Sequence, residues 1–181
     1  MTKRIILAVS GSISAYKSAD LTSKLKKKGY DVHVIMTEAA QAFITPLTLQ
    51  VLSKNPVHTD VLEEKLADRI NHIDLGKKAD LFIVAPASAN TIAKLANGMA
   101  DNMLTATALA LPSTTPKLIA PAMNTKMYDN PLTKKNLNTL DQLGYQEILP
   151  KSGVLACGDT GRGALADINV ILEAIDAKLM H

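Results

Sequence analysis

The sequence is poor in aromatic residues and has almost no cysteine. It contains no tryptophan, and aromatic residues make up 3% of its 181 residues. Proteins that bind single-stranded nucleic acid stack the bases on aromatic side chains, so this class has little support. The single cysteine, Cys157, excludes a disulfide within the chain and is typical of a protein from a reducing compartment.

The chain also lacks a strong net charge and a long hydrophobic run. Its formal net charge is +3 at pH 7. The main lysine cluster, Lys24 and residues 26–28, falls near the end of a predicted helix, where cations are favourable. No apolar stretch is long enough to span a membrane, and the N-terminal apolar run lacks the cleavage site of a signal peptide. We therefore expect a cytoplasmic protein with no nucleic-acid or membrane partner.

Apolar runs and helical patterns alternate along the whole chain. The apolar runs predict buried strands at residues 4–9, 31–36, 80–85, 116–120 and 145–149. Helical patterns follow them at about 14–28, 38–53, 71–78, 88–97, 101–111, 132–143 and 167–179. This alternation predicts one α/β domain over residues 1–181, a doubly wound, Rossmann-like parallel sheet with a flavodoxin-like strand order. A glycine-rich loop is expected at residues 153–163.

Small, hydroxyl-bearing and amide side chains follow nearly every predicted strand. They occupy residues 10–14, 37–38, 86–91, 121–124 and 153–163. In open α/β sheets, ligands bind beyond the carboxyl ends of the strands, which share one edge in a parallel sheet. Each segment alone is also compatible with an ordinary turn, but their agreement on one edge predicts a lined crevice.

The segment after the first strand does not match the known dinucleotide or triphosphate loops. Gly11 is followed by Ser-Ile-Ser-Ala, so G-x-G-x-x-G is absent, and Lys17 follows Tyr16 rather than the glycine of G-x-x-x-x-G-K. The hydroxyls and amides at this helix start still suit one phosphate. A mononucleotide cofactor therefore fits better than NAD, and Glu38 is only a weak match to the acidic ribose-binding residue of nicotinamide enzymes.

His72 is a candidate catalytic base. It lies in the first turn of the predicted helix that precedes the third strand, with Asn71 as a candidate cap. A helix antiparallel to the sheet would bring this turn to the carboxyl edge, where the helix dipole favours a neutral, basic imidazole. A surface or capping histidine is the alternative. No Cys, His and carboxylate group has the spacing of metal ligands, so no metal is expected.

Several separated motifs together resemble one known family. They are residues 10–13 (SGSI), 71–75 (NHIDL), 88–91 (SANT), 121–124 (PAMN) with Met127, and 155–159 (LACGD). From Ile5 to the last helix, the chain resembles the homo-oligomeric flavin-containing cysteine decarboxylases. The resemblance implies an FMN cofactor, and the residues implied to hold it are Gly11, Ser12, Ile13, Thr37, Ser88, Ala89, Asn90, Thr91 and Ala122.

The same resemblance assigns catalytic and substrate-binding roles. His72 is implied as the catalytic base, and Cys157, on a flap over the site, as a proton donor. The residues implied to bind the substrate are Asn124, which grips its carboxylate, Met127, and the backbone groups of Val154 and Ala156. Without the resemblance, Met127 is an ordinary core or interface residue.

Two features depart from the pattern of many bacterial members. Gly-Arg-Met usually follows the Cys-Gly-Asp segment, whereas here Ala164 and Leu165 follow Gly163, so any contact of that arginine is absent or is made by Arg162. Bifunctional relatives continue into a synthetase domain where this sequence stops. No cytidine-nucleotide chemistry is therefore expected of it.

The implied substrate is 4'-phospho-N-pantothenoylcysteine, which is converted to 4'-phosphopantetheine in coenzyme A biosynthesis. The implied reaction is transient oxidation of the substrate thiol, loss of CO2 and re-reduction, with FMN as the electron carrier. Direct loss of CO2 would leave an unstabilised carbanion, whereas a C=S group can accept those electrons. The resemblance also implies a homo-oligomer, a trimer that can assemble into a dodecamer, with its sites between subunits.

Three other functions share parts of this pattern. A decarboxylase acting on the C-terminal cysteine of a peptide-antibiotic precursor is the nearest, and the Cys157 flap favours the coenzyme A pathway over it. A prenyl-FMN synthase would share the fold, but we do not expect the PAMN segment there. A non-catalytic flavin-binding regulatory subunit is disfavoured because His72, Asn124 and Cys157 are all present.

We expect Cys157→Ser to separate the last chemical step from the earlier ones. Glycines flank Cys157, so it is expected on a loop, and an unperturbed thiol with a pKa of about 8.5 can donate a proton at neutral pH. The variant should release CO2 but accumulate a product two hydrogens lighter than phosphopantetheine, measured by mass spectrometry after one turnover. Normal phosphopantetheine would make Cys157 structural, and absence of CO2 would place it in an earlier step.

Overall fold

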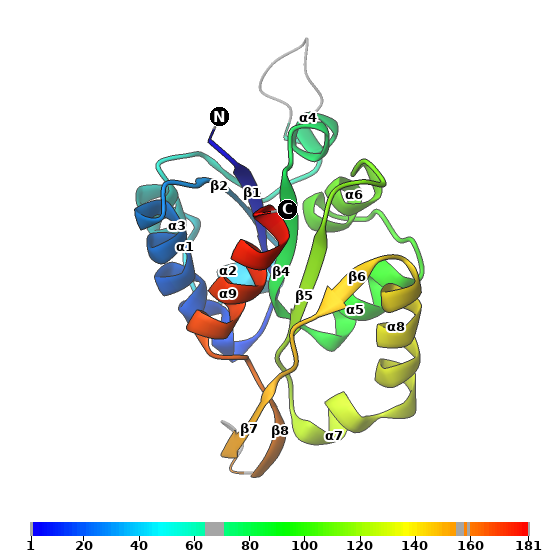
Figure 1. Ribbon diagram of the computed structural model, residues 1–181. Coiled ribbons are helices and arrows are strands. Elements are labelled where there is room, and N and C mark those ends of the chain that lie inside the picture. Colours follow the sequence, from blue (N-terminus) through cyan, green and yellow to red (C-terminus); the bar gives the residue numbers. More distant parts are fainter. Residues whose placement is uncertain (1, 64–70, 155–157, 159, 181) are drawn as a thin grey trace.

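A six-stranded parallel sheet runs through the middle of the molecule (Figure 1). The computed structural model describes residues 2–63, 71–154, 158 and 160–180. The strands are β1 (Arg4–Val9), β2 (Asp31–Met36), β3 (Val57–His58), β4 (Leu81–Ala87), β5 (Lys117–Pro121) and β6 (Tyr145–Glu147). Their order across the sheet is β3-β2-β1-β4-β5-β6. Without the two-residue β3, this is the predicted flavodoxin-like order, so the fold class is confirmed.

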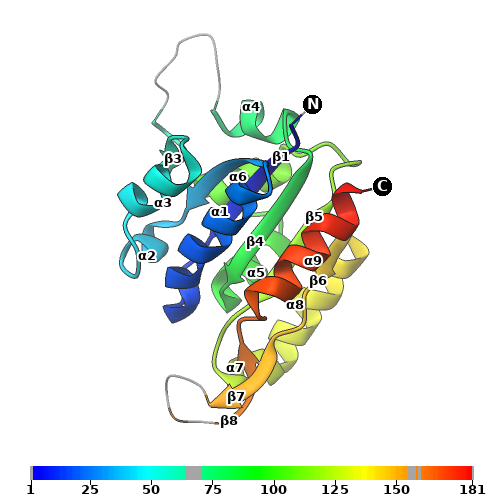
Figure 2. The same ribbon diagram turned by 60° about the vertical axis from the view of Figure 1, so that its left-hand side comes forward.

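Helices cover both faces of the sheet, as Figures 1 and 2 show. One face carries α1 (Lys17–Lys27), α3 (Pro46–Ser53) and α9 (Ile168–Leu179). The other carries α4 (Asn71–Lys77), α5 (Ala89–Ala96), α6 (Met103–Leu109) and α8 (Pro131–Gln142). Short helical turns lie near the strand ends: η1 (Ile13–Tyr16), α2 (Glu38–Gln41) and α7 (Thr125–Asp129). No helix in the described part of the chain is long and apolar enough to cross a membrane.

The strands are apolar throughout because both faces of the sheet are buried. In β1, Ile5 and Leu7 pack into the core under α1 and α9, whereas Ile6 and Ala8 pack into the core on the other face. All four side chains are fully buried. Successive side chains of a strand point to opposite faces, so a strand between two cores needs an apolar residue at each position.

Two segments differ from the sequence-based expectation. The helix predicted over residues 38–53 is divided into α2 and α3, because Pro46 cannot continue a helix and instead occupies the first turn of a new one capped by Thr45. The expected glycine-rich loop contains an antiparallel hairpin of β7 (Lys151–Val154) and β8 (Thr160–Ala164). Both Figures 1 and 2 place this hairpin beyond the carboxyl ends of the main strands.

The hairpin is fastened to the segment that follows β5 through a glycine. The amide of Met123 donates a hydrogen bond to the carbonyl oxygen of Gly163 at 2.9 Å. A Cβ atom at Gly163 would lie 2.3 Å from the carbonyl oxygen of Met123, so only glycine allows this approach. Gly153, on the opposite strand of the hairpin, has nothing within 4 Å of its Cβ position.

We expect Gly163→Ala to destabilise the protein and Gly153→Ala to leave it nearly unchanged. The first methyl group must displace backbone, for which overpacking costs of about 1–3 kcal/mol are typical. The second enters open space, where effects stay within about 0.5 kcal/mol. Urea unfolding of the two variants beside the wild type measures this difference. Equal stability of the two variants would show that the hairpin is not held by this contact.

Candidate functional site

Two adjoining cavities lie where the strands end, with volumes of about 470 Å³ and about 460 Å³. Residues from the ends of β1 and β4 line both of them: Gly11, Ser88 and Ala89, together with Met127. The strand order reverses between β1 and β4, because the chain passes from β1 to β2 on one side and reaches β4 on the other. In open α/β sheets this reversal is where ligands bind.

A serine hydroxyl joins the two strand ends at this point. The Oγ of Ser10 donates a hydrogen bond to the carbonyl oxygen of Pro86 at 2.8 Å and accepts one from the amide of Ser88, also at 2.8 Å. Ser10 is fully buried. The expectation that its hydroxyl is available to a phosphate is therefore wrong, because both of these hydrogen bonds are made within the protein.

Several helices begin at the walls of these cavities. The side chains of Ser12, Thr37, Ser88 and Asn102 cap the first turns of η1, α2, α5 and α6 respectively. Each of these residues lines one or both cavities. Free amide groups and partial positive charge are concentrated at helix N-termini, so convergent helix starts favour an anionic ligand.

Small residues line the cavities, and one of them is required for close packing of the loop after β1 against α2. A Cβ atom at Gly11 would lie 2.6 Å from the Cβ of Ala39. Ala89 and Ala122 contribute only methyl groups to the walls. Side chains this small leave space for a ligand beside the backbone.

The structure brings together most of the predicted site residues. All nine residues expected to hold FMN line the two cavities: Gly11, Ser12, Ile13, Thr37, Ser88, Ala89, Asn90, Thr91 and Ala122. Asn124 and Met127 line the 470 Å³ cavity. Val154 ends β7, and Ala156 and Cys157 lie outside the described residues.

Asn124 is held in place by the helix turn that it begins. Its Oδ1 accepts a hydrogen bond from the amide of Lys126 at 2.8 Å and caps α7. The adjacent Met123 is fixed through Gly163, so the loop after β5 is fastened on both sides. The Asn124 side chain is therefore held at the wall of the cavity.

His72 lies elsewhere. Figures 1 and 2 both place α4 at the amino ends of the strands, and His72 is not among the residues that line the two cavities. The expectation that His72 points into the crevice of its own chain is therefore wrong. The seven residues of α4 extend about 10 Å, so this helix is much shorter than β4, whose seven residues extend about 23 Å. The Nδ1 atom of His72 is buried and has no hydrogen-bond partner among the described residues.

The sequence-based reasoning missed three charged residues and a tyrosine at the cavity walls. Lys17 and Tyr16 line the 470 Å³ cavity, and Lys94 and Asp101 line the 460 Å³ cavity, where they form an ion pair. The signal that could have identified these residues is their position in the sequence. Each lies within about two turns of a predicted helix start at the carboxyl edge.

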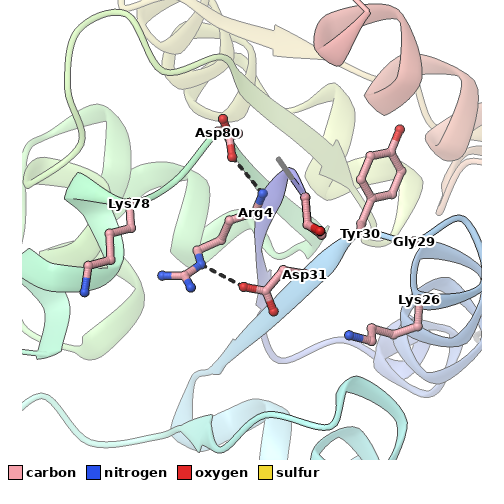
Figure 3. A pocket seen from close by; sticks show the side chains of 8 residues that line it. Arg4, Lys26, Gly29, Tyr30, Asp31, Lys78 and Asp80 are labelled. Carbon is pink, nitrogen blue, oxygen red and sulfur yellow. Dashed lines mark hydrogen bonds and ion pairs between the residues drawn. The ribbon is translucent and has the colours of Figure 1, made fainter.

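A larger cavity of about 620 Å³ lies at the opposite, amino-terminal edge (Figure 3). The Nε of Arg4 donates to Asp31 at 2.9 Å, and the amide of Arg4 donates to Asp80 at 2.7 Å. Burial opposes ionisation of Asp31, but hydrogen bonds from Asn55, His33 and Arg4 outweigh it and lower the pKa of Asp31 to about 2. The charges of Arg4 and Asp31 thus compensate each other, and the contacts of Arg4 tie the starts of β1, β2 and β4 together, which is a structural role.

The chain matches known flavoproteins along its length. The family model described as Flavoprotein matches residues 1–180. A probable phosphopantothenoylcysteine decarboxylase of Streptococcus mutans is 62% identical over 179 residues, which are 99% of this chain and 100% of that protein. The coenzyme A biosynthesis bifunctional protein CoaBC of Bacillus subtilis is 53% identical over 171 residues, 94% of this chain and 42% of that protein.

Solved structures agree with these relatives. A PPC decarboxylase complexed with pantothenoylaminoethenethiol has a TM-score of 0.92 at 35% identity, with 100% of both chains covered. The FMN-dependent cysteine decarboxylase SpaF has a TM-score of 0.86 at 32% identity, with 98% of this chain and 95% of that chain covered. The resemblance predicted from the motifs is confirmed, and the chain belongs to the Flavoprotein family.

Proposed function

We propose that the protein is an FMN-dependent decarboxylase that converts 4'-phospho-N-pantothenoylcysteine to 4'-phosphopantetheine in coenzyme A biosynthesis. The observation that carries this proposal is that all nine residues expected to hold FMN line two adjoining cavities at the strand-order reversal. The full-length similarity to a probable phosphopantothenoylcysteine decarboxylase supports the choice of substrate. The lone cysteine and this pathway both favour a cytoplasmic location.

The chemistry of the cavity walls fits FMN. The capped helix starts at Ser12, Thr37 and Ser88 offer amides and positive potential to a phosphate. The small side chains of Ala89 and Ala122 leave room for a flat ring system. Bound FMN supplies a reversible two-electron carrier, so that the substrate thiol can be oxidised before CO2 leaves and reduced afterwards.

The protein's own residues bind the substrate and move its protons. Asn124, fixed at the start of α7, holds the substrate carboxylate until CO2 is lost. His72 acts as the base that accepts a substrate proton. Cys157 donates a proton to the product carbon. Ile13 and Met127 place apolar side chains at the cavity wall, where they would help to exclude water once a partner covers them.

His72 and Asn124 do not meet within one chain, so we propose that a neighbouring subunit completes each site. The N-terminal half of α4, with His72, would enter the cavity of the next subunit in a homo-oligomer, a trimer that can assemble further. Apolar side chains at the cavity are uncovered in the single chain: Ile13 is 57% exposed, Tyr16 58% and Met127 50%. Contiguous exposed apolar residues of this kind are typical of surfaces that a partner covers.

A peptidyl-cysteine decarboxylase is the second candidate function. The observation that favours it is the similarity in fold to the cysteine decarboxylase SpaF. Its substrate would be a long peptide, whereas the relative with 62% identity is named for a small conjugate. A non-catalytic flavin-binding subunit would require neither His72 nor Asn124.

Turnover of the two substrate classes tests the proposal. The purified protein is incubated with phosphopantothenoylcysteine and, separately, with a peptide that ends in cysteine. We expect CO2 release and phosphopantetheine, measured by mass spectrometry, from the first substrate alone. Turnover of the peptide alone would assign the second candidate function, and turnover of neither would indicate a non-catalytic flavin-binding protein.

Mixed oligomers test the shared site. His72→Asn and Asn124→Asp are each expected to be inactive, and Asp keeps the cap on α7. Co-expressed in equal amounts, they should recover roughly a quarter of wild-type activity, because about that share of interfaces pairs an intact His72 with an intact Asn124. The control is each variant co-expressed with itself. A mixture as inactive as the controls would show that both residues act from the same chain.

A further inference from the structure

Tyr128 connects the helix turn that begins at Asn124 to the central sheet. Its hydroxyl donates a hydrogen bond to Oε1 of Glu147 at 2.8 Å. Glu147 is the last residue of β6, and β6 pairs with β5, the strand that leads to Asn124. The Tyr128 side chain is only 2% exposed. The hydrogen bond therefore closes a loop of structure that begins at β5 and returns to its neighbour β6.

The helix turn α7 needs such a connection because it is short. It has five residues, and a helix of this length is not stable by itself in water. The Asn124 side chain caps the start of the turn, and the amide of Tyr128 donates a hydrogen bond to the carbonyl oxygen of Asn124 at 2.9 Å. This bond joins the backbones of the two residues directly, so a displacement of Tyr128 also moves Asn124.

Contacts on the ring and at the hydroxyl together fix the Tyr128 side chain. The Nζ of Lys134 in α8 lies 3.4 Å from the centre of the Tyr128 ring, and a cation over an aromatic face is a favourable contact. Burial and the hydrogen bond to Glu147 raise the pKa of the Tyr128 hydroxyl well above its usual value, against the opposing charge of Arg162. The hydroxyl therefore keeps its proton at neutral pH and remains a donor to Glu147.

The same turn contributes residues both to the cavity and to the core. Asn124 and Met127 line the 470 Å³ cavity, whereas Tyr128 packs into the core on the face of the sheet that carries α8. Hydrogen bonds to a carboxylate depend on direction as well as distance, so an amide must be held at the correct angle. We propose that Tyr128 is a positioning residue, whose hydrogen bond to Glu147 sets the orientation in which Asn124 meets the substrate carboxylate. This inference rests on the proposed function.

The test compares the substrate with its own product, because phosphopantetheine lacks only the carboxylate that Asn124 would hold. We measure kcat and KM for phosphopantothenoylcysteine and the Ki of phosphopantetheine as an inhibitor. Tyr128→Phe keeps the ring and removes the hydroxyl, Glu147→Ala removes the acceptor, and Glu147→Gln keeps an acceptor oxygen. Tyr145→Phe is the matched control, because Tyr145 is also buried and lies beneath a lysine but belongs to β6 rather than to α7.

We expect Tyr128→Phe and Glu147→Ala each to lower kcat/KM for phosphopantothenoylcysteine by about 10-fold, the effect of one binding group held in the wrong place. The Ki of phosphopantetheine should be unchanged, because the product offers no carboxylate to Asn124. Glu147→Gln should keep most of the wild-type efficiency, and Tyr145→Phe should behave as the wild type. Bound FMN, measured by its absorbance, should be the same in all four variants if the fold and the cofactor site are kept.

The inference can fail while the proposed function stands. An equal loss of affinity for substrate and product in Tyr128→Phe would give Tyr128 a role in the fold and not in carboxylate recognition. Wild-type efficiency of both Tyr128→Phe and Glu147→Ala would show that Asn124 is oriented without this hydrogen bond. If Tyr128→Phe does not fold, Glu147→Ala at its partly exposed position decides the question. Failure of the wild type to release CO2 would instead refute the proposed function, and the inference with it.

Discussion

The site depends on the hydroxyl group of Ser10, which fixes the ends of β1 and β4 against each other. It donates to the carbonyl oxygen of Pro86 and accepts from the amide of Ser88, and hydrogen bonds of this kind contribute about 1 kcal/mol each. Two helix starts lie close to this link in the sequence, since η1 begins at Ile13, shortly after β1, and α5 begins at Ala89, shortly after β4. The crevice between these helix starts is lined by residues from both sides.

The two edges of the sheet divide structural and functional roles. At the amino edge, Arg4 and Asp31 pair with each other and join neighbouring strands, so their charges neutralise each other and stabilise the fold. At the carboxyl edge, helix starts and the side chain of Lys17 bring positive potential to the cavity walls. An anionic cofactor and an anionic substrate both suit such an edge. His72 lies at the amino edge of its own chain although we propose a catalytic role for it. This is the reason for proposing that subunits share each site.

The sequence predicted the parts of the fold that local pattern determines. β1 and β2 have the predicted bounds, because strands buried on both faces appear as uninterrupted apolar runs. The β7–β8 hairpin was missed because its two strands have no apolar pattern; Gly163 of the hairpin is instead hydrogen-bonded to Met123. The predicted position of His72 was wrong because α4 has only seven residues, and the direction of a helix alone does not bring its first turn to the carboxyl edge. A buried structural serine such as Ser10 has the same sequence signature as a ligand-binding one.

A crystal structure of the flavin-loaded oligomer would test the shared site at the carboxyl edge most directly. We expect flavin density between the ends of β1 and β4, against Gly11, Ser88 and Ala122, with His72 of a neighbouring subunit facing the same cavity. Flavin density in the amino-edge cavity beside Arg4 and Asp31 would contradict the assignment of the site. Flavin in the expected crevice with no His72 from any subunit near it would contradict the sharing of sites between subunits.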